Sequence, residues 1–244
     1  MKALVLCGGL GTRLGDLCAE RPKPLLQVGE YALVEHILLR LAAASIREVF
    51  VNLHFGAAQL VERLGDGSRY GVQVEYFREP ALLGTAGTPR ALSDRAPDGL
   101  LVHYGDVLSD HPLAGLVERL QGSGAAARIV VHERAGSNSR VLLGSDGRVE
   151  RFLERPDAAT AATVASNWAF SGICALSGPC LRALSEAAND LPRDVFPALA
   201  AEGRLFAEPH VGYRCAIDSP ARLTSARAAY SAGQLSPTAP REAT

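Results

Sequence analysis

Short apolar runs alternate with longer segments whose apolar residues recur every three or four positions. The runs at residues 2–7, 48–53, 73–77 and 100–104 have the length of buried strands, and the first ends in Gly8-Gly9. The segments at 33–44 and 57–64 predict amphipathic helices. This alternation predicts right-handed crossovers and a mostly parallel sheet with helices on both faces, whose ligand binds at the carboxyl ends of the strands.

The pattern changes after residue 121, where strand candidates follow one another closely. They lie at 127–132, 141–143, 149–153 and 168–176. One pair is joined by Ser145-Asp146-Gly147, which predicts antiparallel pairing. After these strands, the sequence predicts two helices at 179–188 and 195–201, then a strand at 213–217 and a last helix. That helix starts with Ser219 as its N-cap and Pro220 at its first position, and it ends near Ala232.

Composition narrows the class of protein. The 244 residues are 48% hydrophobic and 21% charged, which is typical of a folded globular chain with one large domain, or less simply two. A net charge of −1 excludes the broad basic face of non-specific nucleic-acid binders. No apolar run spans a bilayer and no signal-peptide pattern precedes the first strand, so we expect a cytoplasmic protein without a membrane partner. The five cysteines lack a C-x-x-C pair and are interpreted as buried thiols.

The most informative motif is Gly8-Gly9-Leu10-Gly11-Thr12-Arg13-Leu14, directly after the first strand. Glycines permit a tight turn, successive backbone N–H groups form a concave anion site, and Arg13 adds a bidentate charge. This chemistry suits a triphosphate, although a bare strand-to-helix turn is the alternative. A dinucleotide fingerprint would need glycine at position 14, and the G-K-[ST] of a P-loop is absent.

A second motif, Arg21-Pro22-Lys23-Pro24-Leu25-Leu26, follows within about ten residues. Lys2 and Lys23 are the only lysines, so Lys23 is not there by composition alone. The flanking prolines are expected to hold an extended backbone and to aim the ammonium group at a phosphate. A solvent-exposed loop lysine is the alternative.

Two carboxylates follow predicted strands and are candidate metal ligands. Asp106 comes after Gly105 at the end of one strand, and Asp218 ends the strand before the last helix. Magnesium is usually held by one or two carboxylates together with substrate phosphates. The alternative for Asp106 is an aspartate that only caps a turn, and the alternative for Asp218 is a structural residue that precedes the Ser219 cap.

Together with Leu83-Gly84-Thr85-Ala86-Gly87 and Gly147-Arg148-Val149 leading into Glu154-Arg155-Pro156, these motifs resemble the sugar-1-phosphate nucleotidylyltransferases in order and spacing. The resemblance implies a Rossmann-like nucleotide-diphospho-sugar transferase fold. It implies a single domain over residues 1–232, with a nucleotide-binding half to about 121 and a sugar-binding half from about 122. Residues 233–244, small and polar with two prolines, are expected to form a flexible tail.

The resemblance also implies roles for single residues. Arg13 and Lys23 would be catalytic, with Lys23 on the α-phosphate, and Asp106 would bind magnesium. Nucleotide binding would fall to Gly8, Gly9, Gly11, Thr12, Glu79 and Gly84. Binding of the sugar phosphate would fall to Glu154, Arg155, Asn167 and Gly172.

The sequence departs from the family pattern at several positions. Aligned on Pro220, Ala216 occupies the usual second metal position, and Asp218 stands two residues later on the same strand face. Arg155 replaces the usual lysine, so its phosphate contact would have an altered geometry. Glu79 stands where several relatives have glutamine, and a carboxylate facing the base would favour GTP over UTP, dTTP, CTP and ATP. No repetitive β-helix follows, so no acyltransferase activity is expected.

We therefore expect a Mg²⁺-dependent enzyme of nucleotide-sugar biosynthesis. It would transfer NMP from an NTP to a sugar-1-phosphate and release pyrophosphate. Transfer to a cyclitol or amino-alcohol phosphate is an alternative, as is a non-catalytic relative that binds a nucleotide-sugar and regulates a partner. The expected partners are the NTP and the sugar-1-phosphate, and the oligomeric state is open, a homo-oligomer included.

Overall fold

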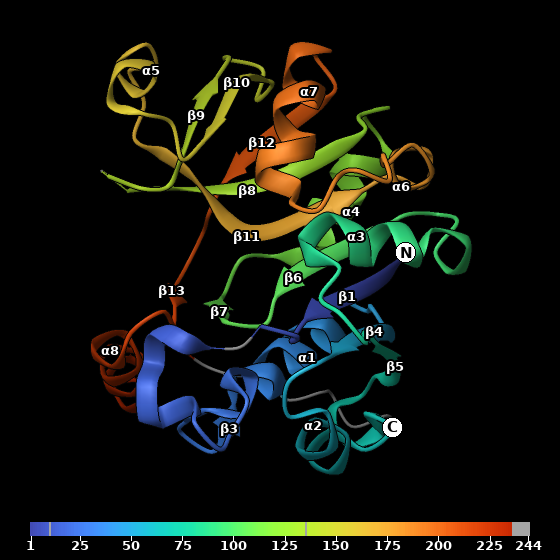
Figure 1. Ribbon diagram of the computed structural model, residues 1–244, viewed down its shortest axis with the longest axis vertical. Coiled ribbons are helices and arrows are strands. Elements are labelled where there is room, and N and C mark those ends of the chain that lie inside the picture. Colours follow the sequence, from blue (N-terminus) through green and yellow to red (C-terminus); the bar gives the residue numbers. More distant parts are fainter. Residues whose placement is uncertain (10, 135, 236–244) are drawn as a thin grey trace. The chain divides into compact units, whose positions relative to one another are not determined.

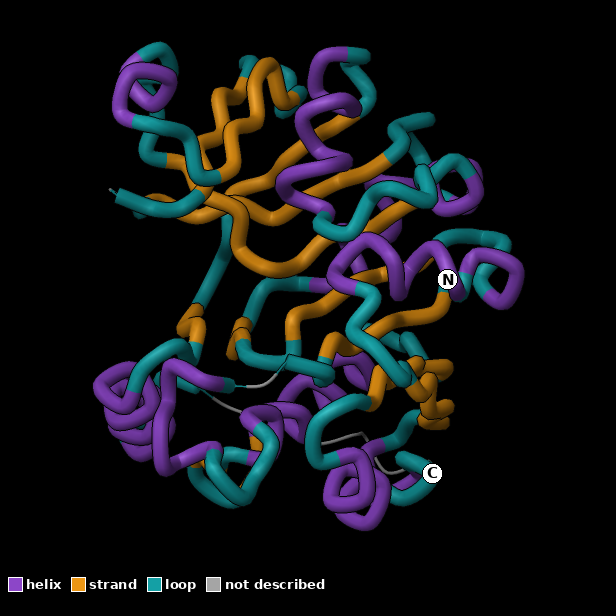
Figure 2. The backbone as a smooth tube through the Cα atoms, viewed as in Figure 1, coloured by secondary structure: helices purple, strands orange, loops and turns teal. Residues whose placement is uncertain are grey.

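The computed structural model describes residues 1–9, 11–134 and 136–235, apart from the side chains of Thr12 and Arg13. Figures 1 and 2 show strands alternating with helices along the chain. Seven strands form a mainly parallel sheet, which confirms the predicted fold class. Among the described residues, no helix is both long enough and apolar enough to cross a membrane.

Contacts divide the chain into two compact units, each made of separate stretches. The first, here called the N-terminal unit, contains the described residues of 2–82, 103–114 and 211–235. The second, the central unit, contains Met1, 83–102 and 115–210. The expected halves on either side of residue 121 are defined by bound ligands and stay a prediction.

The N-terminal unit is built on three parallel strands joined by helices. Strand β1 (Lys2–Leu6) pairs with β4 (Glu48–Leu53), which pairs with β5 (Gln73–Arg78). The connecting helices are α1 (Leu33–Ala43) and α2 (Ala57–Leu64). These elements match the predicted runs to within one residue at each end. The unit's smaller elements and last helix are η1 (Thr12–Cys18), η2 (Lys23–Leu25), β2 (Gln27–Val28), β3 (Tyr31–Ala32), η3 (Ser68–Tyr70), β7 (Val107–Ser109), β13 (Arg214–Ala216) and α8 (Pro220–Ser231).

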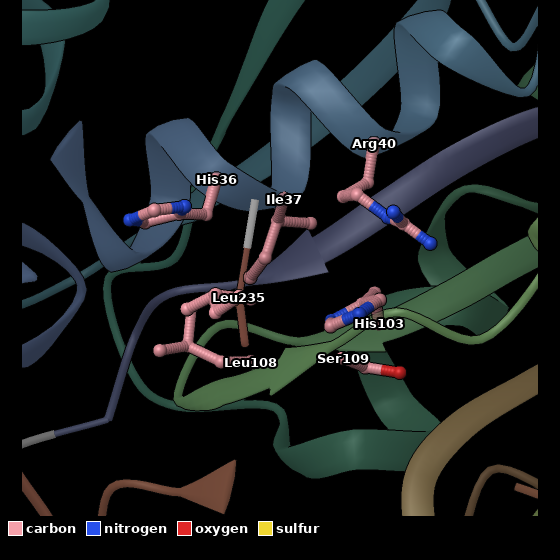
Figure 3. Close-up of a pocket in the computed structure, with 7 residues that line it drawn as sticks. All are labelled: His36, Ile37, Arg40, His103, Leu108, Ser109 and Leu235. Carbon is pink, nitrogen blue, oxygen red and sulfur yellow. The ribbon is translucent and has the colours of Figure 1, made fainter. Parts of the chain in front are cut away.

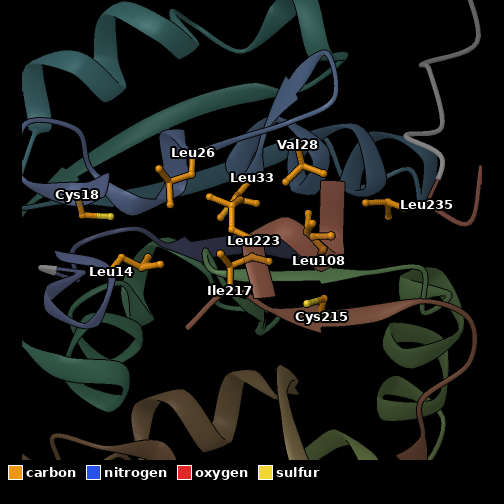
Figure 4. Packing of buried hydrophobic residues seen from close by; sticks show 11 residues of the cluster. Leu14, Cys18, Leu26, Val28, Leu33, Leu108, Cys215, Ile217, Leu223 and Leu235 are labelled. Atoms are coloured by element: carbon orange, nitrogen blue, oxygen red, sulfur yellow. The ribbon is translucent and has the colours of Figure 1, made fainter. Parts of the chain in front are cut away.

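Part of this unit's core links elements that are distant in sequence (Figure 4). Leu33 at the start of α1 packs in one buried cluster with Ile217 and Leu223, which precede and belong to α8. Ser219 caps α8 by accepting a hydrogen bond from the Arg222 N–H, as the sequence predicts. All five cysteines are buried free thiols, which confirms their interpretation. The C-terminal helix is therefore fixed to the same unit as the glycine turn.

The central unit combines an antiparallel pair with a hairpin. Strand β8 (Ala127–Glu133) is antiparallel to β11 (Trp168–Leu176) and parallel to β12 (Leu205–Pro209). The predicted hairpin at Ser145-Asp146-Gly147 is present between β9 (Ser139–Leu143) and β10 (Val149–Glu154). Its helices are α3 (Gly84–Ala91), η4 (Ser93–Arg95), α5 (Ala158–Ala162), α6 (Gly178–Arg182), η5 (Leu191–Val195) and α7 (Phe196–Ala201). Strand β6 (Leu100–Tyr104) and helix α4 (Leu113–Gln121) contribute residues to both units.

Two predictions in the central unit differ from the structure. The helix predicted to continue to residue 188 ends at Arg182, because Arg90 donates hydrogen bonds to the carbonyls of Ser185 and Glu186 and holds this stretch as a loop. Helix α3 was not predicted, since two glycines and a proline weaken its intrinsic propensity. Its first turn is fixed instead by tertiary contact, where the Ala86 N–H donates to the Asn189 carbonyl.

Candidate active site

The glycine turn begins where β1 ends, and its geometry requires glycine at two of its positions. A Cβ atom at Gly8 would lie 2.9 Å from Asn52 Nδ2. Gly11 has a φ of 65°, and its Cβ would crowd Cys18 and Lys23. Among the described residues, no atom lies within 4 Å of the position that a Cβ at Gly9 would take. The side chains of Thr12 and Arg13 lie outside the described part of the structure.

Lys23 and Asp106 form the closest charge pair beside this turn. The Lys23 ammonium donates to Asp106 Oδ2 at 2.6 Å, and the two side chains are 14% and 34% exposed. The expected extended backbone at Lys23 is wrong, because Lys23 starts the 3-10 turn η2 after an extended Pro22. The N–H groups of Leu25 and Leu26 close this turn on the carbonyls of Pro22 and Lys23. The turn still directs the ammonium group at one defined carboxylate.

Asp106 and Asp218 are held in neighbouring segments of the same unit. The Gly105 N–H donates to the Leu6 carbonyl at 2.9 Å, and a Cβ at Gly105 would lie 2.6 Å from that oxygen. The Ile217 N–H donates to the Asp106 carbonyl at 2.8 Å, which brings the residue before Asp218 against Asp106. The Asp218 carboxylate also pairs with Arg222 Nε at 3.3 Å.

The donor set here suits magnesium held jointly with a substrate. Among the described residues no three His, Cys, Asp or Glu side chains gather as a metal cluster. Magnesium does not need such a cage, because it usually takes one or two carboxylates and completes its coordination with phosphates and water. Asp106 and Asp218 offer carboxylate oxygens in adjoining segments, whereas Ala216 has no donor side chain. The residues therefore fit Mg²⁺, and their role as its ligands stays a prediction.

Glu79 follows β5 and is buried, with 4% of its surface exposed. Its Oε1 atom accepts a hydrogen bond from Asn52 Nδ2 at 3.1 Å. The Asn52 oxygen accepts hydrogen bonds from the N–H groups of Cys7 and Gly8, at 2.6 and 3.2 Å. Asn52 is not among the site residues that the sequence predicts. The signal for it was a polar residue near the end of an otherwise apolar strand, since a buried amide needs partners.

In the central unit, Glu154 and Arg155 lie together at the end of β10. Arg155 Nε is 3.6 Å from Glu154 Oε1, and Arg155 has a φ of 46°, which is uncommon for a residue with a side chain. Burial raises the pKa of Glu154, and the nearby Asp190 carboxylate raises it further. The Arg155 guanidinium is largely exposed, so a ligand can reach it from solvent.

The other predicted residues of this unit have backbone roles in the structure. Gly84 starts α3 with a φ of 76°, and its Cβ would lie 2.1 Å from the Asn189 carbonyl oxygen. The Asn167 carbonyl accepts the Arg134 N–H at 2.8 Å. Gly172 has a φ of 85° and lies where the register of β11 shifts between Phe170 and Cys174. Their contacts with a nucleotide or a sugar stay predictions.

The comparisons with known proteins agree with this geometry. A family model for nucleotidyl transferases matches residues 2–209, and the chain belongs to this family. The family resemblance found in the motifs is confirmed. Among solved structures, one assigned as a glucose-1-phosphate thymidylyltransferase of Bacillus anthracis, in complex with a sucrose, is similar in fold. Its TM-score is 0.82 at 21% identity, over 93% of this chain and 94% of that one.

Similar curated proteins include mannose-1-phosphate guanylyltransferases. A probable mannose-1-phosphate guanylyltransferase 1 of Oryza sativa subsp. japonica is 30% identical over 90% of this chain and 62% of its own length. The catalytic subunit beta of this enzyme from Danio rerio gives the same figures. The mannose-1-phosphate guanyltransferase of Schizosaccharomyces pombe is 31% identical over 90% of this chain and 61% of its own length. This chain thus spans about three fifths of the curated relatives it matches.

Proposed function

We propose that this protein transfers a nucleoside monophosphate from an NTP to a sugar-1-phosphate. An oxygen of the sugar phosphate attacks the α-phosphorus, and the bond to the bridging oxygen of the β-phosphate breaks, which releases pyrophosphate. The observation that carries this proposal is the Lys23–Asp106 pair at 2.6 Å beside the glycine turn. This pair supports the proposal because a lysine can bind phosphate and a carboxylate can bind a divalent cation.

The chain's contribution to this reaction is positioning and charge neutralisation. The turn from Gly8 to Thr12 binds the triphosphate, Arg13 adds positive charge, and Lys23 turns from Asp106 to the α-phosphate. Asp106 and Asp218 would hold Mg²⁺, which when bound neutralises phosphate charge. No protein nucleophile is needed.

The sugar phosphate is assigned to the central unit. Glu154 offers acceptor oxygens for sugar hydroxyls, Arg155 offers an exposed guanidinium for the phosphate, and Asn167 and Gly172 belong to the same set. Glu79 and Gly84 are assigned to the base end of the nucleotide. These assignments rest on the family motifs at matching positions.

We propose GTP and mannose-1-phosphate as the pair to test first. The support is that the similar curated proteins are named mannose-1-phosphate guanylyltransferases. The sequence argument for GTP requires the Glu79 carboxylate to face the base. In the structure one of its oxygens accepts from Asn52 instead, so the names of the relatives are the stronger support.

The test is pyrophosphate release from a panel of NTPs against a panel of acceptors, with and without Mg²⁺. Sugar-1-phosphates form one set of acceptors, and cyclitol and amino-alcohol phosphates form the other. We expect turnover only when NTP, a sugar-1-phosphate and Mg²⁺ are all present. Turnover with the second set alone would replace the acceptor class, and tight nucleotide-sugar binding without any turnover would support the regulatory alternative.

Lys23 variants connect that activity to the proposed site. Lys23→Ala should lower kcat by on the order of 10²-fold, because it removes a charge acting on the reacting phosphate. Lys23→Arg should also be impaired, since a planar fork does not replace a compact ammonium. Lys2→Ala is the matched control. Lys2 lies at the start of β1, whereas the glycine turn follows its end, and Lys2 pairs with Glu48. A normal rate for Lys23→Arg would make Lys23 a residue outside the reacting centre.

A further inference from the structure

The loop that carries Lys23 packs against the start of helix α2. Gly56, the N-cap residue of α2, has a left-handed backbone with a φ of 64°. A Cβ atom at Gly56 would lie 2.6 and 2.7 Å from Cγ and Cδ of Pro22, which is closer than van der Waals contact permits. The Pro22 ring therefore rests directly on the Gly56 backbone, and only glycine leaves room for it.

A hydrogen bond holds the same loop three residues further along the chain. Gln59 Nε2 donates to the Glu20 carbonyl at 2.7 Å. A cavity of about 410 Å³ is lined by Arg21 and Leu25 from the loop and by Gln59 and Arg63 from α2. The loop and α2 are separated at this cavity, so we assign the support of the loop by α2 to the contacts at Gly56 and Gln59.

Lys23 follows Pro22 directly, so the position of the proline ring sets the position of the lysine. Pro22 has an extended backbone, and Lys23 then begins the turn η2. The ring is part of the backbone of Pro22, so displacing it moves the attached Lys23 backbone as well. The glycine turn contacts the same residue, since a Cβ at Gly11 would lie 3.3 Å from Lys23 Cβ. The contact of 2.6 Å between the Lys23 ammonium and Asp106 thus depends on where the ring lies.

We propose that Gly56 and Gln59 are positioning residues that hold the Lys23 loop and thereby aim the Lys23 ammonium at the reacting phosphate. This inference rests on the proposed function. Neither residue is assigned a contact with a substrate, so their effect reaches the reaction through Lys23. A displaced lysine lowers kcat more than it raises the KM of either substrate, because its charge acts on the α-phosphate during transfer.

Two glycines at the ends of α2 make a matched pair of variants. Gly56→Ala strains the backbone and also pushes a methyl group into the Pro22 ring. Gly65→Ala, at the other end of α2, strains a backbone with a φ of 58°, but no described atom lies within 4 Å of its Cβ position. We expect kcat to fall about tenfold in Gly56→Ala and to stay within about twofold in Gly65→Ala.

Two further variants connect this effect to Lys23. Adding Gly56→Ala to Lys23→Ala should change kcat by no more than about twofold, because the group that Gly56 positions is already absent. A further tenfold loss in that double variant would show a separate effect of Gly56 and would overturn the proposal. Gln59→Leu removes the hydrogen bond to Glu20 without straining the backbone, so it keeps the proposal testable should Gly56→Ala fold poorly.

Amine labelling measures the position of Lys23 without any turnover. Lys2 and Lys23 are the only lysines, and Arg13 lies between them, so cleavage at arginine places them on separate peptides. Brief reductive methylation and mass spectrometry then give the ratio of Lys23 to Lys2 modification. This ratio should be low in the unmodified protein, because the Lys23 side chain is 14% exposed and that of Lys2 is 30% exposed. It should rise at least about threefold in Gly56→Ala and Gln59→Leu but not in Gly65→Ala.

The labelling ratio separates this proposal from the proposed reaction. If the ratio responds as expected but no acceptor turns over, the reaction fails and the positioning of Lys23 stands. An unchanged ratio in both Gly56→Ala and Gln59→Leu would overturn the positioning role, whatever their rates. An equal rise in Gly65→Ala would overturn it too, since strain at either end of α2 would then loosen the chain alike.

Discussion

At the scale of single residues, Asp106 has two prospective partners. Its Oδ2 atom is paired with Lys23, while its place after β6 and its contact with the segment of Asp218 suit a cation. Both prospective partners are positive, so Asp106 would hold either Lys23 or a cation, and Lys23 would be left for the phosphate when a cation occupies the carboxylate.

The first prediction concerns the two carboxylates. Asp106→Ala and Asp218→Ala should each raise the Mg²⁺ concentration needed for half-maximal rate and lower kcat strongly, because each removes a ligand of a two-carboxylate site. The melting temperature without Mg²⁺ should change little for Asp218→Ala, since its ion pair with Arg222 is one-third exposed and such pairs contribute about 0–1 kcal/mol. Magnesium titrations and thermal melts of both variants make the measurement.

The opposite result for Asp218 has a specific structural meaning. A variant that keeps its rate and Mg²⁺ dependence but melts several degrees lower would make Asp218 a structural residue before the Ser219 cap. Asp106, phosphates and water would then hold the metal. Asp218→Asn distinguishes these outcomes, because the amide retains the shape of the side chain without its charge.

Single residues also show which parts of the site can be predicted from the sequence. The spacing of Gly8, Gly11 and Lys23 predicts a phosphate-binding turn next to a lysine, because glycine permits a tight turn and proline restricts the backbone beside the lysine. Asn52 and Glu79 could not be paired from sequence, since their hydrogen bond depends on β4 and β5 being neighbours in register. The 3-10 turn at Lys23 was missed because closing it depends on two backbone hydrogen bonds that local propensity does not specify.

At the scale of elements, Glu35 joins α1, α2 and η3. The side chain is buried, and its oxygens accept from Arg63 Nε and Nη2 at 2.8 and 2.9 Å and from the Ala32 N–H at 2.6 Å. The Tyr70 hydroxyl is a further donor. Burial alone would raise the pKa of Glu35, but these hydrogen bonds outweigh it and the pKa is lowered. In its charged form, the Glu35 carboxylate therefore links these three elements of the N-terminal unit.

The second prediction follows from that burial. Glu35→Ala should lower the free energy of unfolding by about 3 kcal/mol, because removing one member of a buried pair leaves its hydrogen-bonding partners without an acceptor. This expected loss lies at the low end of the usual range for breaking a buried ion pair. The reason is that the Arg63 side chain is 42% exposed and can hydrogen-bond to water once Glu35 is removed. Urea unfolding at pH 7 is the measurement.

Its matched control is Glu62→Ala, an exposed glutamate on α2. This change should stay within about 0.5 kcal/mol. Equal effects of the two substitutions would show that the Glu35 contacts do not account for the loss. Because the pKa of Glu35 is lowered in the folded state, its contribution is present above pH 4.5 and is lost as the pH falls below that value.

Elements differ in how well their sequences predict them. Strand β4 and helix α2 have the predicted limits because their apolar periods are uninterrupted. Strand β12 was not predicted, since Glu208 and Pro209 make its sequence look like a loop. In the structure, Glu208 accepts two hydrogen bonds from Arg119, at 2.7 and 2.5 Å. A partner distant in the sequence therefore stabilises this strand, and the local sequence pattern does not reveal it.

At the scale of the whole molecule, we expect stability toward acid to depend on a buried histidine. His103 in β6 faces a small cavity of about 10 Å³, lined also by His36 and Arg40 of α1 and by Leu108 and Ser109 of β7 (Figure 3). Its Nδ1 atom interacts with the Tyr104 carbonyl at 3.0 Å. The pKa of His103 is lowered to about 4, mainly by burial and with smaller contributions from Arg40 and Arg214, while the hydrogen bond to the Tyr104 carbonyl and the Asp106 carboxylate act in the opposite direction.

The last prediction concerns the sign and range of this effect. Above pH 6.5 the His103 ring is neutral in both the folded and the unfolded chain. Between pH 6.5 and 4 the unfolded chain binds a proton there and the folded chain does not, so stability falls by about 1.4 kcal/mol per pH unit, on the order of 3 kcal/mol in total. His103→Gln, which has no titrating ring, should lose this part of the pH dependence.

Urea unfolding at several pH values between 7.5 and 4.5 measures the slope for both proteins. His36, whose pKa burial also lowers, keeps its own contribution in both, so their difference isolates His103. Should His103→Gln fold poorly, NMR titration of the unmodified protein answers the same question. A His103 ring that titrates near pH 6.5 in the folded state would show that water reaches the cavity and would remove the predicted acid sensitivity.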